Sequence, residues 1–263
     1  MRSCRNYLIV VHLSVVFSTA AFAQDAEEFF RQGSRSFTAQ DRSAAIAAFR
    51  KSVELKPDFA PAWKALGVVF ASQGDFENAE DSFRNACERQ PGLSDACLYH
   101  GRTLYLLNRF QPAVLALRAV LQREKENPEA WRLLALSLEA LGDVRPAGDA
   151  FRQAVRFNRG ASPNEDPGID YGVYLFRQGR AEEAIVPLEA AARRHPDSFR
   201  AQLELGCVQL ALDRLDEAAA HLQRAVALEP RGARGHLLLG KVYQRQGKDR
   251  DAAEQLSLGR SGK

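Results

Sequence analysis

Apolar residues between positions 60 and 93 recur at helical spacing, in two runs separated by a short polar break. The first run has spacings of three, one and three residues, which return to one side of a helix, and comprises Trp63, Leu66, Gly67 and Phe70. Gly74 and Asp75 interrupt this run. The second run comprises Ala79, Phe83 and Ala86, and Pro91 ends it. The pattern predicts two helices joined by a tight turn.

The same pattern returns along most of the chain. We place seven units, at residues 26–59, 60–93, 94–127, 128–161, 165–198, 199–232 and 233–263. One alanine position recurs in all of them, as Ala45, Ala79, Ala113, Ala147, Ala184, Ala218 and Ala252. Six units carry glycine in the first helix where the fourth has Ala135. Because glycine costs about 1 kcal/mol relative to alanine inside a helix, its repeated use predicts that neighbouring helices approach closely there.

The order W-x2-L-G-x2-F over residues 63–70, followed by Ala, Phe, Ala and Pro, closely resembles the tetratricopeptide repeat (TPR). The resemblance covers Ala26 to the C-terminus. It implies an all-α fold, an α-α superhelix that forms a right-handed solenoid of about seven helix-turn-helix repeats over residues 24–263. Residues 162–164 interrupt the register after the fourth repeat. The surrounding segment 159–168 is either a hinge or a longer inter-repeat loop, and we favour the loop.

The first 23 residues have the features of a secretory signal peptide. Arg2 and Arg5 precede an apolar run, and small residues, Ala21 and Ala23, flank Phe22 at the expected cleavage site. The run is about ten residues long, shorter than the roughly twenty that span a bilayer. We therefore expect cleavage after Ala23 and a periplasmic or secreted protein. An uncleaved N-terminal membrane anchor is the alternative.

Composition and motifs narrow the possible functions. The net charge of +3 is too small to indicate a nucleic-acid partner. The histidines are scattered among different repeats, and we find no metal-type Cys/His spacing, nucleophile motif or phosphate-binding glycine loop. His100 takes the position of Leu66 and Leu134 and is interpreted as a packed residue. We therefore expect no enzyme activity, no metal, no cofactor and no small-molecule substrate.

Three cysteines, Cys87, Cys97 and Cys207, remain once the signal peptide with Cys4 is removed. Cys87 falls late in one predicted helix and Cys97 early in the next. A disulfide between them is conceivable in an oxidising compartment. The demanding geometry of a disulfide favours the other interpretation, in which both thiols are small apolar residues packed between helices.

In the TPR family the first helix of each pair lines a concave groove, and this implies where a ligand binds. The residues predicted to face the groove form an apolar floor with basic residues along it, and we select Phe30, Phe37, Lys64, Val68, Arg102, Tyr105, Arg132, Leu136, Val173, Phe176, Leu203, Cys207 and Lys241. The alternative is that some of them pack against the second helix of their own repeat. Arg102 and Arg132 are expected to add charge selectivity.

One TPR subclass grips a terminal carboxylate with Lys and Asn at fixed groove positions. Lys64 matches the first Lys, but Val68 stands where the Asn belongs, so recognition of a chaperone's acidic tail is not expected. We expect a non-enzymatic scaffold, a monomer or weak homo-oligomer, that binds a protein or peptide segment in the groove. The alternative is an assembly subunit or accessory module of an envelope enzyme or export complex, docking through the solenoid ends or convex face.

Overall fold

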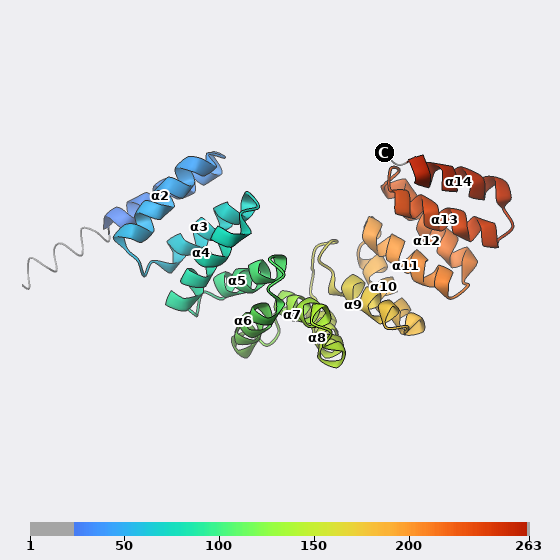
Figure 1. Cartoon of the computed structure of the whole chain (residues 1–263), viewed down its shortest axis with the longest axis horizontal. Coiled ribbons are helices and arrows are strands. Elements are labelled where there is room, and N and C mark those ends of the chain that lie inside the picture. The colour runs from blue at the N-terminus through green and yellow to red at the C-terminus, as the bar shows by residue number, and fades with distance from the viewer. Residues whose placement is uncertain (1–23, 262–263) are drawn as a thin grey trace, which may run out of the picture. The chain divides into compact units, whose positions relative to one another are not determined.

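The computed structural model describes residues 24–261, and the predicted signal peptide and Cys4 lie outside this range. All regular structure in the described part is helical, which confirms the all-α class of helix pairs (Figure 1). The chain divides into two compact units, Met1–Arg123 and Glu124–Lys263. We call them unit 1 and unit 2 and describe each by itself.

Unit 1 begins, within the described residues, with a helical segment over 24–38. Its other helices are α2 (Arg42–Leu55), α3 (Ala60–Ser72), α4 (Phe76–Arg89), α5 (Ser94–Leu106) and α6 (Phe110–Arg123). Helix α3 packs against α4 and α5 against α6, while α4 also contacts α5. The core of the first part is built around Phe49, Leu66 and Phe83.

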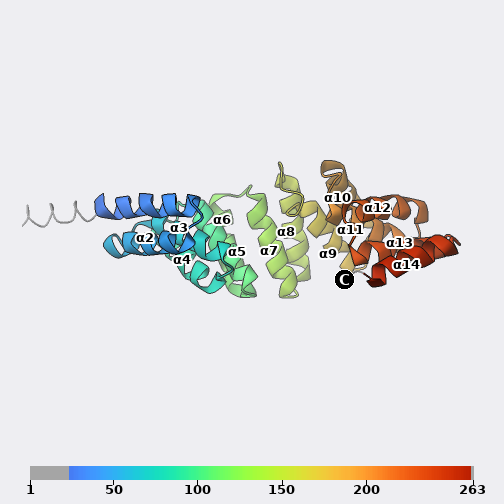
Figure 2. The ribbon, with the colours of Figure 1, turned by 90° about the horizontal axis from the view of Figure 1, so that it is seen from above.

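Unit 2 contains four helix pairs (Figure 2). They are α7 (Pro128–Ala140) with α8 (Val144–Phe157), α9 (Pro167–Arg177) with α10 (Ala181–Arg194), α11 (Phe199–Ala211) with α12 (Leu215–Leu228), and α13 (Ala233–Arg245) with α14 (Asp249–Ser261). The first helices of successive pairs also touch, α7 against α9, α9 against α11 and α11 against α13. They therefore form one connected face, which we call the first-helix face.

The turn inside each helix pair requires one residue with a left-handed backbone. In the second predicted repeat this residue is Gly74, with a φ of 77°, and the repeated register puts the same conformation at Gly142, Gly179 and Gly247. Gln40, Asn108 and Asp213 adopt it in the remaining repeats. Glycine is the residue that tolerates this conformation best. The break at Gly74 and Asp75 is thus a conformational stop, and the side chain of Asp75 then caps α4 at the backbone N–H of Asn78.

The recurrent small residues lie where helices touch. The Ala79 side chain is fully buried, as are its counterparts in the other repeats to within 2% exposure. A Cβ added to Gly67 would lie 2.7 Å from the Phe83 ring. Glycine at this position therefore makes room for the large side chain of the second helix, which confirms the close approach predicted from the sequence.

A side-chain hydrogen bond fastens the start of several first helices. The indole N–H of Trp63 donates to the carbonyl of Pro57 at 2.9 Å. The same register position, also six residues after its acceptor, is used by Trp131 to Lys125 at 2.8 Å, Gln202 to Pro196 at 3.0 Å and His236 to Pro230 at 2.9 Å. We call this contact the junction hydrogen bond, because it ties the inter-repeat turn to the following helix.

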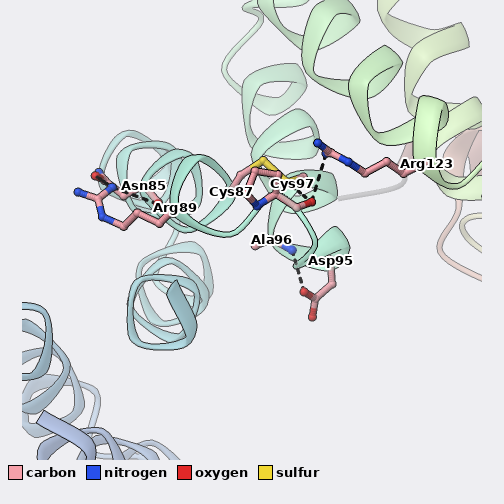
Figure 3. The surroundings of a disulfide bond; sticks show 8 residues. Asn85, Cys87, Arg89, Asp95, Ala96, Cys97 and Arg123 are labelled. Atoms are coloured by element: carbon pink, nitrogen blue, oxygen red, sulfur yellow. Dashed lines mark hydrogen bonds between the residues drawn. A yellow bond between two sulfur atoms is a disulfide. The ribbon is translucent and has the colours of Figure 1, made fainter. Parts of the chain in front are cut away.

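Cys97 occupies the junction position between α4 and α5, and there the fastening is covalent. A disulfide joins Cys97 to Cys87, whose Cα lies 4.8 Å away (Figure 3). The prediction from the sequence that Cys87 and Cys97 are two separate thiols packed between helices is therefore wrong. The last turn of α4 and the first turn of α5 bring the two Cα atoms within the range that a disulfide spans. Arg123 reaches the same turn and donates to the carbonyl of Pro91 at 3.2 Å.

The segment 159–168 lies inside unit 2, away from the division between the units. Its Asp166 is fully buried and forms an ion pair with Arg194 of α10. The same carboxylate accepts a hydrogen bond from the backbone N–H of Gly168 at 2.8 Å and so caps α9. These contacts anchor the end of the segment and favour the interpretation as a longer loop over that as a hinge.

Candidate functional site

The first-helix face of unit 2 is held together by buried ion pairs. Arg132 of α7 lies 2.7 Å from Glu129 and 3.1 Å from Asp170 of α9, and Arg132 is only 8% exposed. Asp170 is also buried, and its second carboxylate oxygen lies 2.5 Å from Arg200 of α11. Burial alone would lower the pKa of Arg132, but the hydrogen bonds and charges of Glu129 and Asp170 raise it above its usual value. Asp170 therefore links three successive first helices.

Other charged side chains on the first-helix face of unit 2 are also paired. Arg234 of α13 makes a two-point contact with Glu204 of α11, at 2.6 and 3.0 Å. Arg177 of α9 lies 3.3 Å from Glu139 of α7. These contacts join residues about one repeat apart and give the first-helix face a scaffold of mutually neutralised charges.

An open recess of about 510 Å³ lies on this face. We call it the unit-2 recess. Its lining comes from α9, α11 and α13 and comprises Phe176, Cys207, Leu210, Ala211, Leu238, Lys241, Gln244 and Arg245. The apolar members outnumber the polar ones, and the polar members all come from α13. Burial raises the pKa of the Cys207 thiol and the nearby Glu204 adds to the effect, so Cys207 is a neutral group at ordinary pH.

Unit 1 has a recess of its own, of about 380 Å³. We call it the unit-1 recess. It is lined by α3, α4 and α5, through Val68, Ala71, Phe76, Phe83, Tyr99, Arg102, Thr103 and Leu106. The disulfide joins two of the three helices that form these walls. Lys64 of α3 pairs with Asp95 of α5 at 2.7 Å, so the Lys that matched a carboxylate-binding position contacts a carboxylate of the same chain.

The structure brings some of the predicted groove residues together. Val68 and Arg102 share the unit-1 recess. Phe176, Cys207 and Lys241 share the unit-2 recess. Leu136 and Val173 are half-buried on α7 and α9.

Other predicted groove residues have structural contacts. Phe30 packs against the rings of Phe49 and Phe59, at centroid distances of 5.7 and 5.3 Å, and Phe37 packs on the same core. The Tyr105 ring lies 5.8 Å from that of Phe110. Leu203 is 3% exposed and belongs to the core of unit 2.

Arg132 differs most from its predicted role of adding charge selectivity to the groove, because its charge is already balanced by the carboxylates of Glu129 and Asp170. We therefore leave Arg132 out of the proposed ligand contacts. Its partner Asp170 was not predicted from the sequence, nor were Glu204, Leu238 and Arg245. The signal for the ion pairs was present, since opposite charges recur about one repeat apart on the first helices.

Two further features are missing from residues 24–261. No group of three or more His, Cys, Asp or Glu side chains there is arranged to hold a metal ion. None of the helices in that range is long and apolar enough to cross a membrane.

The paired helices, the close-packed glycine and alanine positions and the first-helix face define a TPR protein. The chain matches the family described as "Cilia and flagella-associated protein 70 C-terminal domain", a TPR family, over residues 17–235, which is most of its length, and it belongs to that family. Proteins of the TPR fold generally mediate protein–protein interactions and are typically non-enzymatic.

Curated relatives are similar over part of their length. The BBSome complex member bbs-4 of Caenorhabditis elegans is 26% identical over 199 residues, which cover 73% of this chain and 42% of that protein. The small glutamine-rich TPR-containing protein 2 of Mycosarcoma maydis is 28% identical over 116 residues, covering 44% of this chain and 33% of that protein. The chain thus spans less than half of the length of these relatives.

Solved structures share the fold. A TPR protein from Parabacteroides merdae has a TM-score of 0.68 at 15% identity, covering 90% of this chain and 93% of that one. PilF of Pseudomonas aeruginosa has a TM-score of 0.66 at 20% identity, covering 86% and 99%. YrrB, described as a TPR protein with an unusual peptide-binding site, has a TM-score of 0.58 at 17% identity, covering 70% and 94%.

Proposed function

We propose that the chain is a scaffold that binds a segment of a partner protein on its first-helix face, with the unit-2 recess as the main contact. The observation that carries this proposal is the recess itself. Three successive first helices contribute an apolar floor, in which Phe176 and Leu238 are half-buried and Leu210, a residue of the unit-2 core, is 8% exposed. Apolar surface left open in this way is a recognised feature of interaction sites.

The ion pairs on the first-helix face support a preformed site. Asp170 holds α7, α9 and α11 together through Arg132 and Arg200, so the helices do not need to be ordered when the partner binds. A preformed surface loses less conformational entropy on binding than a flexible one. The affinity then comes from burial of apolar side chains of the partner.

The location outside the cytoplasm is part of the same proposal. The Cys87–Cys97 disulfide supports it, because such bonds persist mainly in oxidising compartments. The N-terminal 23 residues support it through their signal-peptide pattern. Sequencing the N-terminus of the protein purified from its native host tests this point. A mature protein that begins at Gln24 is expected, and an intact N-terminus in a cytoplasmic fraction would contradict it.

The binding proposal is tested by replacing an apolar residue of the recess floor. Proteins captured from the native envelope or secreted fraction are identified by mass spectrometry, and each candidate is then measured with purified components. The substitution Phe176→Asp should weaken binding at least about tenfold, because it places a charge in the apolar contact.

The matched control is Val186→Asp, which changes a 69% exposed residue of the second helix α10, away from the recess. It should leave binding unchanged, and circular dichroism should show the same helix content for both variants. Equal binding by the native chain and the Phe176→Asp variant would remove the unit-2 recess from the function.

A further inference from the structure

Nearly all charges around the unit-2 recess are neutralised within the chain. Arg245, at the rim, pairs with Asp213 at 2.6 Å and donates to the carbonyl of Leu210 at 2.9 Å. Arg234 is neutralised by Glu204. The exception is Lys241, which is exposed on α13 and makes no ion pair with any residue in the part of the chain that the structure describes.

Lys241 stands directly beside apolar surface. Cys207 and Leu238 line the same recess, and the ammonium is near enough to Cys207 to influence its titration. Because burial keeps the Cys207 thiol neutral, that thiol supplies no counter-charge to the lysine. Gln244 adds a neutral amide to the same rim, which donates or accepts a hydrogen bond. The recess thus offers an apolar floor and one net positive charge at its edge.

From this arrangement we infer that the unit-2 recess selects a partner segment that carries an apolar side chain beside a carboxylate. The apolar side chain enters between Phe176, Leu210 and Leu238, and the carboxylate pairs with Lys241. This inference rests on the proposed binding function and states which sequences it favours. A rim ion pair contributes more to selectivity than to affinity, so the acidic group discriminates among segments that the apolar floor would otherwise accept alike.

The selectivity is measured by selecting binders from a random-sequence peptide display library on the immobilised full chain. Peptides recovered by the native protein should be enriched in Asp or Glu within a few residues of Leu, Ile, Phe or Met. Parallel selection on the Lys241→Glu variant should reverse the preference and enrich Lys or Arg beside the same apolar residues. A synthetic acidic peptide from the first selection should bind the Lys241→Glu variant at least about fivefold more weakly.

The matched control is Lys125→Glu, which makes the same change of charge at an exposed residue of unit 2 that does not line the recess. It should retain the acidic preference of the native chain, since only its overall charge has changed. If this control reverses the preference as well, the selection reports net charge, and the role of Lys241 is overturned.

The other outcomes separate this inference from the proposed function. Peptides that compete at the recess but show no acidic enrichment would overturn the role of Lys241 and leave the apolar binding site standing. A failure of both selections to enrich any peptide would count against both. Laurate, which carries an apolar chain and a carboxylate, serves as the non-peptide probe. If laurate binds in a Lys241-dependent manner while no peptide is enriched, the ligand is a small amphiphile and the inference of a protein segment is overturned.

Discussion

The two units fasten their repeats by different means. In unit 1, the junction between α4 and α5 carries a disulfide, and the first helices α3 and α5 are linked by the partly exposed pair Lys64–Asp95. In unit 2, Asp170 joins α7, α9 and α11 through two arginines. Unit 1 also has ion pairs between repeats, such as Arg109 with Glu77 of α4 at 2.7 Å, but the described part of unit 2 has no disulfide and its one cysteine is free. The two units should therefore respond to different perturbations.

Removal of the central carboxylate should have the largest effect. The substitution Asp170→Ala leaves Arg132 buried with one remaining partner and removes the buried contact of Arg200. Unpairing a buried ion pair costs about 3–5 kcal/mol, so unit 2 should lose stability by that order. The chain has two tryptophans, Trp63 in unit 1 and Trp131 in unit 2. Urea unfolding followed by Trp131 fluorescence in a Trp63→Phe background therefore reports on unit 2.

The matched control for this measurement is Asp149→Ala, whose carboxylate forms an exposed pair with Arg152 of the same helix. That variant should lose less than about 1 kcal/mol. If Asp170→Ala behaves like the control, the ion pairs do not hold unit 2 together and the contrast between the units disappears.

Loss of the disulfide should be the next largest effect, confined to unit 1. The bond joins residues ten apart in the sequence, and a loop of this size contributes about 3 kcal/mol by constraining the unfolded chain. The double substitution Cys87→Ala with Cys97→Ala should lower the stability of unit 1 by about this amount. Trp63 fluorescence in a Trp131→Phe background measures it, and reduction of the native protein by dithiothreitol should reproduce it. A change of similar size at Trp131 would show that the units do not respond separately.

Breaking the Lys64–Asp95 pair should have a small effect. Both side chains are partly exposed, at 29% and 49%, so solvent screens the pair and its contribution is below about 1 kcal/mol. A double-mutant cycle with Lys64→Ala and Asp95→Ala, measured by unfolding of unit 1, determines the coupling energy. A coupling energy above about 2 kcal/mol would show that this ion pair stabilises unit 1 as strongly as a buried ion pair does, which contradicts the expected difference between the units.

The smallest expected effect concerns reactivity. Burial, aided by Glu204, raises the pKa of Cys207, so the reactive thiolate forms only above the pH range of an exposed cysteine. Alkylation by iodoacetamide should therefore become fast at a higher pH in the native chain than in urea. A bound partner segment should slow it further by covering the unit-2 recess. An alkylation profile identical in native and unfolded protein would contradict the burial of this thiol.

Much of the architecture could be predicted because the same residue pattern recurs in every repeat, so a clear repeat identifies the equivalent positions in weaker ones. The glycine position facing Phe83 and the alanine position of Ala79 were readable from their recurrence alone. Ion pairs were harder to predict, since Arg132 and Asp170 each look like ordinary surface residues within their own helix. Their contact depends on how two repeats stack, and the three-residue insertion at 162–164 shifts the spacing between them.

The disulfide shows a second limit of sequence reasoning. Cys87 and Cys97 occupy positions where small apolar residues pack, and that role accounted for both of them. The distance between their Cα atoms follows from the inter-repeat turn and not from the spacing alone. The candidate site was limited in the same way, because Val68 and Lys241 were predicted on the groove while the recesses around them depend on side chains of three helices.

The junction position has a consequence for protein engineering. Trp63, Trp131, Gln202 and His236 use it for a hydrogen bond, and Cys97 uses it for a covalent bond to a residue ten positions earlier. The corresponding pair at the last junction is Val226 and His236. Cysteines at these two positions would place a second crosslink in the same register. The junction thus provides a transferable site at which a repeat array can be made dependent on, or independent of, the redox state of its surroundings.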